Sequence, residues 1–223
     1  MAAVALSLTV GGTVGMRASA AAGGDKGKAT VSREAVVFHD QMRRLWEDHI
    51  TWTRLTIVSF AADLPDLELT EQRLLRNQVD LGNAFKPYFG DAVGNQLTAL
   101  LRQHILGAVD VLEAAKAGDE ERLAAAVAAW YANGQEIADF LSAANPKHWP
   151  QDQIRALMRE HLDTTLKEAS NRLQGDFAAD IAAYDEVHDH ILVMSDFLSC
   201  GVIGRFPKKF GQSAHSKANA LCP

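Results

Sequence analysis

Two Gly-Asp pairs in the second half of the chain place the strongest constraint on its fold. Gly118-Asp119 and Gly175-Asp176 each lie between two long segments in which apolar residues recur at the spacing of an α-helix. Glycine adopts the left-handed conformation that often follows a helix end, and aspartate caps the start of the next helix. A turn this short makes the helices that it joins antiparallel neighbours. Each pair therefore predicts a helical hairpin.

Helical periodicity covers most of the chain. A first helix is expected at residues 33–62, one hairpin at residues 92–117 and 119–143, and the other at residues 151–173 and 176–205. Residues 64–91 are expected to form a long connection with one short helix near residues 70–73, capped by Thr70. The composition is rich in alanine and leucine, and strand-forming residues do not alternate. The sequence thus predicts an all-α protein, an up-and-down bundle of about five long helices.

The two hairpins are similar in sequence. When residues 99–142 are shifted by 57 positions onto residues 156–199, 12 of the 44 positions are identical. The matches include the Gly-Asp turn, the Asp-Phe-Leu-Ser blocks beginning at Asp139 and Asp196, and the pair His104 and His161. We interpret this as an internal duplication, which would place His104 and His161 at equivalent points. The alternative is that two helical hairpins resemble each other by chance, because helical heptads do.

Both ends of the chain are expected to lie outside the bundle domain, which is assigned to residues 31–210. Residues 2–16 are small and apolar, Ala18-Ser19-Ala20 matches a signal-peptide cleavage pattern, and a polar linker follows. Residues 1–30 are therefore interpreted as a signal peptide and linker, which predicts a secreted or extracytoplasmic, cell-envelope protein. No basic residue precedes the apolar run, so either the true start lies upstream or this segment is a disordered extension of a cytoplasmic protein. Residues 211–223 are expected to be a flexible tail.

Charge and hydropathy exclude several classes of partner. The net charge of −6 argues against nucleic acid as the main partner, since phosphate binding needs a basic surface. No stretch reaches the roughly 18 uncharged apolar residues that a membrane span requires, so an integral membrane protein is not expected. Cys200 and Cys222 are too few for a disulfide framework; Cys200 is expected to pack in the core, and their pairing is left open. The basic and aromatic residues 204–210 are a candidate contact with the cell envelope, or else cations placed at a helix end.

Four of the eight histidines stand out because each lies near the middle of a different expected helix. His49, His104, His161 and His188 lie about 15–24 Å from the start of their helices, at about 1.5 Å per residue, so they can share one layer of the bundle. Asp185, three residues before His188, can face the same way. Glu136 lies near this level on the remaining helix. The other four histidines, His39, His148, His190 and His215, are expected near helix ends or on polar faces.

This layer has two interpretations. The first is a site for iron, copper or zinc, or for a small ligand, with His49, His104, His161, His188, Asp185 and Glu136 as the candidate ligands. The second is a hydrogen-bonded polar layer in which partners such as Asn133 and Thr165 satisfy the imidazoles. The chain has no Glu-x-x-His, His-x-x-x-His, His-Glu-x-x-His or Gly-x-Ser-x-Gly motif. The ferritin-like, hemerythrin, zinc-peptidase and hydrolase-elbow patterns are therefore missing.

Three functions follow from these interpretations. We expect first a binding protein, second a metal-dependent oxidase or hydrolase that uses an open coordination position, and third a structural envelope protein. A separate candidate is the connection at residues 71–91. There, Arg73, Arg76, Asn77, Lys86 and Tyr88 can bind an anion or cover one end of the bundle. The alternative is a lid that packs its leucine and phenylalanine side chains onto the helices.

Several short runs carry a family resemblance over about residues 40–210. They include residues 45–49 (Leu-Trp-Glu-Asp-His), 74–77 (Leu-Leu-Arg-Asn) and 130–133 (Trp-Tyr-Ala-Asn). The chain resembles a small bacterial family of secreted or surface-associated helical proteins, whose members often carry the name acetylglutamate kinase. That kinase is an α/β protein that holds phosphates in glycine-rich loops between strands and helices. This chain offers neither feature, so the resemblance implies a helical exported protein and not a kinase.

Overall fold

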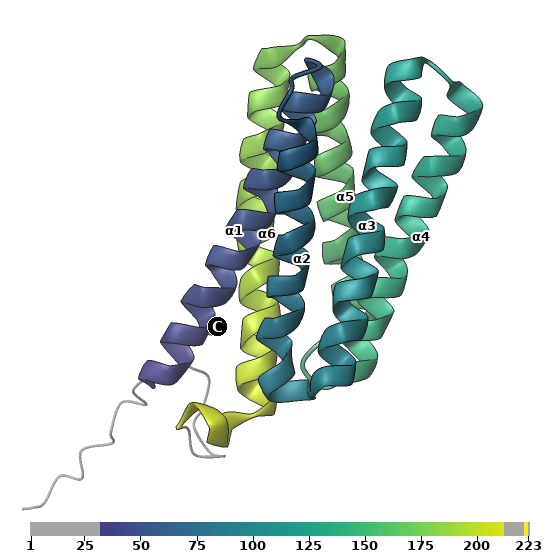
Figure 1. The fold of residues 1–223 in the computed structure, drawn as a ribbon. Helices are drawn as coiled ribbons and strands as arrows, with labels where there is room; N and C mark the ends of the chain where they lie inside the picture. Colours follow the sequence, from purple (N-terminus) through teal and green to yellow (C-terminus); the bar gives the residue numbers. More distant parts are fainter. Residues whose placement is uncertain (1–31, 212–220, 223) are drawn as a thin grey trace, which may run out of the picture.

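A computed structural model describes residues 32–211 and 221–222. In these residues it contains six α-helices and one 3-10 helix: α1 (Arg33–Ala61), α2 (Leu67–Phe89), α3 (Asp91–Ala117), α4 (Glu120–Ala144), α5 (Gln151–Gln174), α6 (Phe177–Arg205) and η1 (Pro207–Phe210). The described residues form no strand, and the helices alternate in direction (Figure 1). The prediction of an all-α up-and-down bundle is confirmed.

The helices form a closed ring. Each helix packs against the next one in the chain, and α6 packs against α1 (Figure 1). In addition, α1, α3 and α5, which run in the same direction, contact one another across the ring. The inner faces of these three helices therefore meet at the centre of the bundle.

Both predicted Gly-Asp turns are confirmed. Gly118 and Gly175 are left-handed, with φ of 67° and 76°. The side chain of Asp119 accepts a hydrogen bond from the backbone N–H of Arg122, and the side chain of Asp176 accepts one from that of Ala179. These caps begin α4 and α6 one residue after the aspartate, within one or two residues of the expected boundaries.

The expected irregular connection at residues 64–91 is wrong, because residues 67–89 form the continuous helix α2. Its buried face includes Asn77 and Gln78. These two polar residues interrupt the helical spacing of apolar residues, and the prediction depended on that spacing. Pro87 lies within the last turn of the helix, which ends only at Gly90. Thr70 does not cap a helix, since its hydroxyl donates to the carbonyl of Leu67 inside the first turn.

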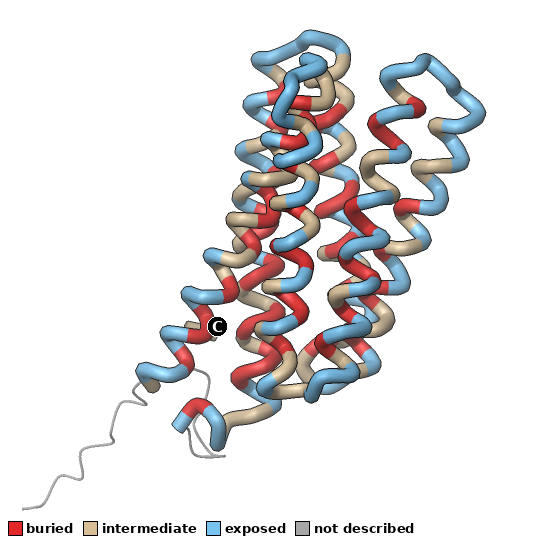
Figure 2. The backbone as a smooth tube through the Cα atoms, viewed as in Figure 1, coloured by how far each residue is buried: buried red, intermediate tan, exposed pale blue. Residues whose placement is uncertain are grey.

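Buried residues follow the inward side of every helix (Figure 2). The largest wholly buried side chains include Trp149, Phe85 and Met42. A smaller apolar cluster of Ile57, Leu112 and Ala169 is separate from this main core.

 Ile57 lies on α1, Leu112 on α3 and Ala169 on α5. The small cluster therefore lies between the three inner helices, toward the end of the bundle that carries the Gly-Asp turns.

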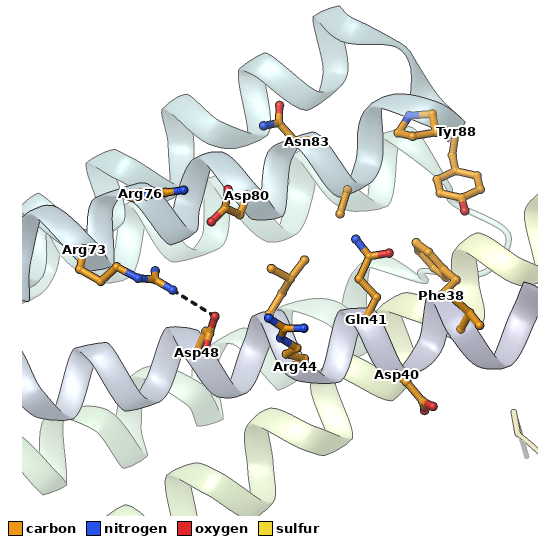
Figure 3. Close-up of a pocket in the computed structure, with 14 residues that line it drawn as sticks. Phe38, Asp40, Gln41, Arg44, Asp48, Arg73, Arg76, Asp80, Asn83 and Tyr88 are labelled. Carbon is orange, nitrogen blue, oxygen red and sulfur yellow. Dashed lines mark hydrogen bonds and ion pairs between the residues drawn. The ribbon is translucent and has the colours of Figure 1, made fainter.

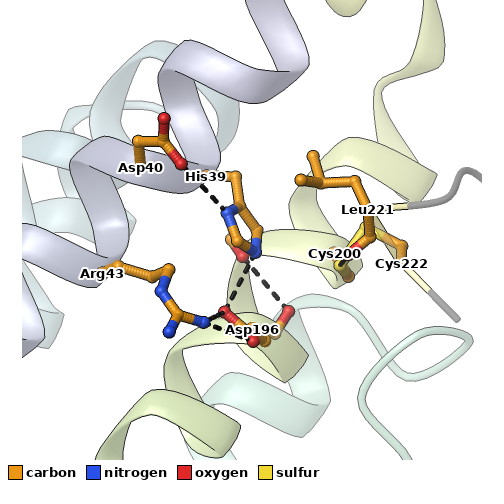
Figure 4. A network of polar contacts seen from close by, with 8 residues as sticks. His39, Asp40, Arg43, Asp196, Cys200, Leu221 and Cys222 are labelled. Carbon is orange, nitrogen blue, oxygen red and sulfur yellow. Dashed lines mark hydrogen bonds and ion pairs between the residues drawn. A yellow bond between two sulfur atoms is a disulfide. The ribbon is translucent and has the colours of Figure 1, made fainter. Parts of the chain in front are cut away.

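A disulfide holds the end of the described chain against α6. Cys200 and Cys222 form this bond, which decides the pairing that the sequence analysis left open (Figure 4). Beside it, Asp196 accepts hydrogen bonds from Arg43 Nη1 at 2.7 Å, and its Oδ1 lies 2.9 Å from Nε2 of the buried His39. This network joins α6 to α1. His39 lies near the start of α1, as the sequence analysis expected, and it is buried in a polar contact between two helices.

The aromatic residues of the segment 204–210 pack inward. The Phe210 ring lies 5.2 Å from that of Tyr88 and 5.3 Å from that of Phe38, and Phe206 contacts both Tyr88 and Phe89. The aromatic part of the predicted envelope contact is thus used inside the fold, which leaves its cations to face outward.

The signal peptide and linker expected at residues 1–30 lie outside the described residues, as do residues 212–220 and 223 of the expected tail. In the part that the structure describes, no helix has the length and apolar character to cross a membrane.

Candidate functional site

Three imidazoles meet at the centre of the bundle. His49 on α1, His104 on α3 and His161 on α5 are all buried, each at most 4% exposed. The ring centroid of His161 lies 5.6 Å from that of His49 and 6.2 Å from that of His104. These are the three inner helices of the ring, and the sequence prediction that these three histidines share a layer is correct.

The ring of His104 is oriented by an amide. Its Nδ1 lies 3.0 Å from Oδ1 of Asn133 on α4, and Asn133 Nδ2 donates to the backbone carbonyl of Leu100. The second bond fixes the amide so that its oxygen faces the imidazole, and Nδ1 of His104 must then carry the proton. Nε2 of His104 is left with a free lone pair. Trp130 stacks on the same ring at 5.1 Å between centroids and donates to the carbonyl of His104.

The ring of His49 contacts two buried amides of α2. Its Nδ1 lies 3.3 Å from Nε2 of Gln78, which also donates to the carbonyl of Leu74 and lies 3.2 Å from Oδ1 of Asn77. Asn77 in turn donates to the carbonyl of Leu45. Both amides are wholly buried. They explain why α2 places polar residues in its core face, since these residues hold the imidazole of His49.

His161 has no such support. Its Nδ1 is buried without a hydrogen-bond partner. The ring stacks on that of His190, whose centroid lies 6.4 Å away and whose Nε2 is 2.8 Å from the carbonyl oxygen of Leu157. A buried polar atom without a hydrogen-bond partner destabilises a fold by about 1–3 kcal/mol. The Nδ1 atom of His161 is such an atom, whereas Nδ1 of His49 and Nδ1 of His104 each have a partner.

Burial keeps the three rings neutral. It lowers the pKa of His49 to about 3 and that of His104 to about 4, and for His49 the neighbouring His104 adds to the effect. Burial also places the pKa of His161 well below its usual range, with further lowering from His49, His104 and His190. Near neutral pH the layer therefore presents uncharged imidazoles, the form that binds metal ions.

The other predicted site residues lie elsewhere. His188 is 40% exposed on the outer side of α6, with Nε2 at 3.4 Å from Oε1 of Glu47. Asp185 and Glu136 are exposed. The structure thus brings together three of the six predicted ligands. His188 fails because His190, two residues later and about 200° around the helix, faces the interior instead.

His190 and the amides of α2 are the site residues that the sequence analysis missed. A signal for His190 was present in the proposed duplication, because the shift of 57 positions places it on Asn133. In the structure, Asn133 contacts His104 and His190 contacts His161, so the two pairs are equivalent. Asn77 and Gln78 offered no such signal, since they lie in the segment that was expected to be a connection.

Within residues 32–211 and 221–222, no three His, Cys, Asp or Glu side chains already form an arrangement that fits a metal ion. The two pairs of rings that include His161 nonetheless come close to it. Two imidazoles on one tetrahedral ion have ring centroids about 5 Å apart, given metal–nitrogen distances of about 2.0–2.1 Å. The observed separations of 5.6 and 6.2 Å exceed that by little more than 1 Å.

A second buried polar cluster lies near the turn between α5 and α6. Nη1 of Arg54 lies 2.7 Å from carboxylate oxygens of both Glu168 and Asp180, and Arg172 reaches Asp180 at 3.4 Å. Both carboxylates are almost fully buried. Burial raises the pKa of Glu168 to about 7, against the opposing effect of Arg54. The cluster joins α1, α5 and α6.

A groove of about 930 Å³ runs along the outer surface between α1 and α2 (Figure 3). Its charged side chains are balanced in number: Arg44, Arg73, Arg76, Asp40, Asp48 and Asp80. Arg73 is already engaged, since its Nη2 lies 3.2 Å from Oδ2 of Asp48. Of the residues expected to bind an anion, Arg73, Arg76 and Tyr88 line the groove. Asn77 is buried, and the side chain of Lys86 lies against Gly94 of α3. This balance of charge does not favour an anion.

Comparisons with protein-family models, with curated proteins and with solved structures found no match to this chain. Its function is therefore inferred from its own residues.

Proposed function

We propose that this chain is an exported binding protein that holds a transition-metal ion between His49, His104 and His161. The observation that carries the proposal is the convergence of three buried, neutral imidazoles from the three inner helices. Imidazole suits zinc, copper and iron, and three ligands leave a coordination position open for a further group.

The contacts around the rings support this proposal. Histidines that bind metals usually use one ring nitrogen for the metal and hold the other in a hydrogen bond, which fixes the ring. His104 has this arrangement, with Nδ1 on Asn133 and Nε2 free. The Nδ1 atom of His49 becomes free for a metal when Gln78 donates its amide hydrogen to Asn77 Oδ1 instead, at 3.2 Å, and Nε2 then carries the ring proton. His161 supplies the ring that no hydrogen bond holds, and it can rotate toward the other two.

A structural polar layer is the second candidate, and the amide contacts of His49 and His104 favour it. In that case the imidazoles only define how α1, α3 and α5 pack together. The two candidates differ in one observable respect: a structural layer takes up no metal.

The test is titration of purified, metal-free protein with Zn²⁺ and Co²⁺, followed by calorimetry and visible absorption. We expect one ion per chain, and strong loss of binding in His161→Gln, a replacement that keeps a polar side chain. The matched control is His188→Ala, which removes a histidine that lies outside the cluster. Circular dichroism checks that both variants fold. Binding that survives in folded His161→Gln, or that is lost equally in His188→Ala, would overturn the proposal.

The disulfide supports the exported location within this proposal. Disulfides persist in oxidising compartments and are rare in the cytosol. The Cys200–Cys222 bond agrees with the signal peptide that the sequence predicts for residues 1–30. Cell fractionation of the natural host, with the thiol content of the protein measured in the same fractions, tests the location. A protein found in the cytosol with two free thiols would contradict it.

A further inference from the structure

An apolar cleft leads from the end of the bundle that carries the Gly-Asp turns to the histidine cluster. Its outer part, about 410 Å³, lies between the α3–α4 hairpin and α5. Its inner part is narrower, with room for about 40 Å³, and lies between α1, α3 and α5. Four residues line both parts, Val111, Leu112, Leu166 and Ala169, so the two parts adjoin each other. Figure 1 shows the tip of the α3–α4 hairpin standing apart from the α5–α6 hairpin at this end.

The inner part ends one helical turn from the imidazoles. Thr53 and Thr165 line it, and their hydroxyls donate to the backbone carbonyls of His49 and His161, four residues earlier on the same helices. Trp130, which stacks on His104, also lines this part. The cleft therefore approaches the candidate metal site from one side.

The chemistry of the walls specifies the occupant. No charged side chain lines either part of the cleft. The polar residues Ser170 and Gln174 lie on the last turns of α5, at the outer part. At the inner part, Thr56 is 3% exposed and its Oγ1 has no hydrogen-bond partner. Cavities with such apolar walls are dry and take up apolar molecules.

The shape specifies the occupant further. Along α5 the lining extends from Thr165 to Gln174, which spans about 14 Å at about 1.5 Å per residue. The cleft is wide near the solvent and narrows to the size of a few atoms near Thr56. This form fits an extended chain better than a ring system.

We propose that this cleft binds the alkyl chain of a single-chain amphiphile. The chain lies between α3 and α5 with its terminal carbons toward Thr56, and the polar headgroup stays at Ser170 and Gln174 by the open end. This site is distinct from the metal site and does not require that a metal be bound.

The experiment uses 8-bromo-1-octanol, because a bromine atom quenches tryptophan fluorescence on contact and Trp130 lines the inner part. We expect saturable quenching that Trp130→Phe abolishes, although three other tryptophans remain. In a competing series from 1-butanol to 1-octanol, affinity should rise roughly fourfold for each added methylene, as expected for burial of CH₂ groups.

Two variants block the cleft at different depths. Ala108→Phe fills the inner part, and Ala115→Phe narrows the outer part at a half-buried position where folding is more tolerant. Ala182→Phe makes the same change at an exposed position of α6 and serves as the matched control. Saturable quenching that is lost in both cleft variants and kept in the control supports the proposal. Quenching that does not saturate, or that persists in folded Ala115→Phe, would overturn it, whatever the protein's metal content.

Discussion

Burial decides the protonation state of the histidine cluster at the scale of single residues. In the unfolded chain each imidazole takes up a proton near pH 6.5, whereas the folded protein keeps His49 and His104 neutral down to about pH 3 and 4. Between these values the unfolded state binds more protons than the folded state. The free energy of unfolding must therefore fall as the pH falls through this window, and the contribution is fully restored above pH 6.5.

This linkage gives a prediction for His104. Between pH 7.5 and pH 5 its lowered pKa should remove about 2 kcal/mol of the free energy of unfolding. Urea unfolding of the wild type and of His104→Gln over this range measures the effect, and the variant should lose less stability on acidification by about that amount. His188→Ala, with a half-exposed ring, is the control and should follow the wild type. Equal pH slopes for His104→Gln and the wild type would contradict the buried, neutral assignment.

Glu168 acts in the opposite direction. Its pKa is raised from 4.5 to about 7, so between these values the folded state binds a proton that the unfolded chain releases. The resulting stability is present below pH 4.5 and is lost as the pH rises to about 7. The pH dependence of the wild type is thus a sum of opposing effects, which is why a difference between His104→Gln and the wild type is the quantity to measure.

At the scale of elements, close packing between α2 and α3 depends on two glycines. A Cβ at Gly94 would lie 2.6 Å from the carbonyl oxygen of Gly82, a backbone atom that cannot move aside without separating the helices. We expect Gly94→Ala to destabilise the fold by about 3 kcal/mol, as overpacking does. Gly107→Ala on the same helix is the control, since its nearest contact is a side-chain atom of Trp130 at 3.3 Å. Thermal unfolding that ranks the two variants the other way would refute this account of the contact.

The ionic cluster that joins α1, α5 and α6 gives a second prediction at this scale. Asp180→Asn would leave Arg54 and Arg172 without their shared buried carboxylate. Breaking such a buried pair from one side costs about 3–5 kcal/mol. Chemical denaturation at pH 7 checks this, with Asp163→Asn on the exposed surface of α5 as the control. A loss below about 1 kcal/mol in Asp180→Asn would mean that the cluster contributes little to holding the three helices together.

The sequence predicted the helices correctly where characteristic capping residues mark their ends. The hairpins were located to within two residues because glycine and aspartate have specific roles at helix ends. Helix α2 was missed because Asn77 and Gln78 take up core positions and Pro87 was interpreted as a break. Only three of the six predicted ligand residues lie in the histidine cluster, for a related reason. Height along a helix follows from residue counts, whereas the choice between His188 and His190 depends on helix rotation within a fold whose second helix was not expected.

At the scale of the whole molecule, the disulfide closes the C-terminal end of the described chain onto α6 across 22 residues. Replacing both cysteines by serine should lower the free energy of unfolding by about 3 kcal/mol, mainly because the unfolded chain gains freedom. Denaturation of this double variant beside the wild type, each with and without a reducing agent, measures it. The reducing agent should weaken only the wild type, and an equal response in both proteins would contradict the assigned bond.

The closed ring of helices explains why one layer can serve as a site. Because α1, α3 and α5 contact one another across the ring, a side chain from each of them can meet at the centre. The outer helices then supply the supporting groups: Gln78 from α2, Asn133 from α4 and His190 from α6. All six helices thus contribute to the candidate site, three through an imidazole of the cluster and three through a contact that positions it.

The most direct test of the central claim is the metal content of the protein as its natural host makes it. The protein should be purified without an affinity tag or chelator and measured by elemental mass spectrometry. We expect close to one equivalent of zinc, copper or iron in the wild type and in His188→Ala, and almost none in His161→Gln. A folded wild-type protein that carries no metal and takes up none when it is added would contradict the claim and favour the structural polar layer.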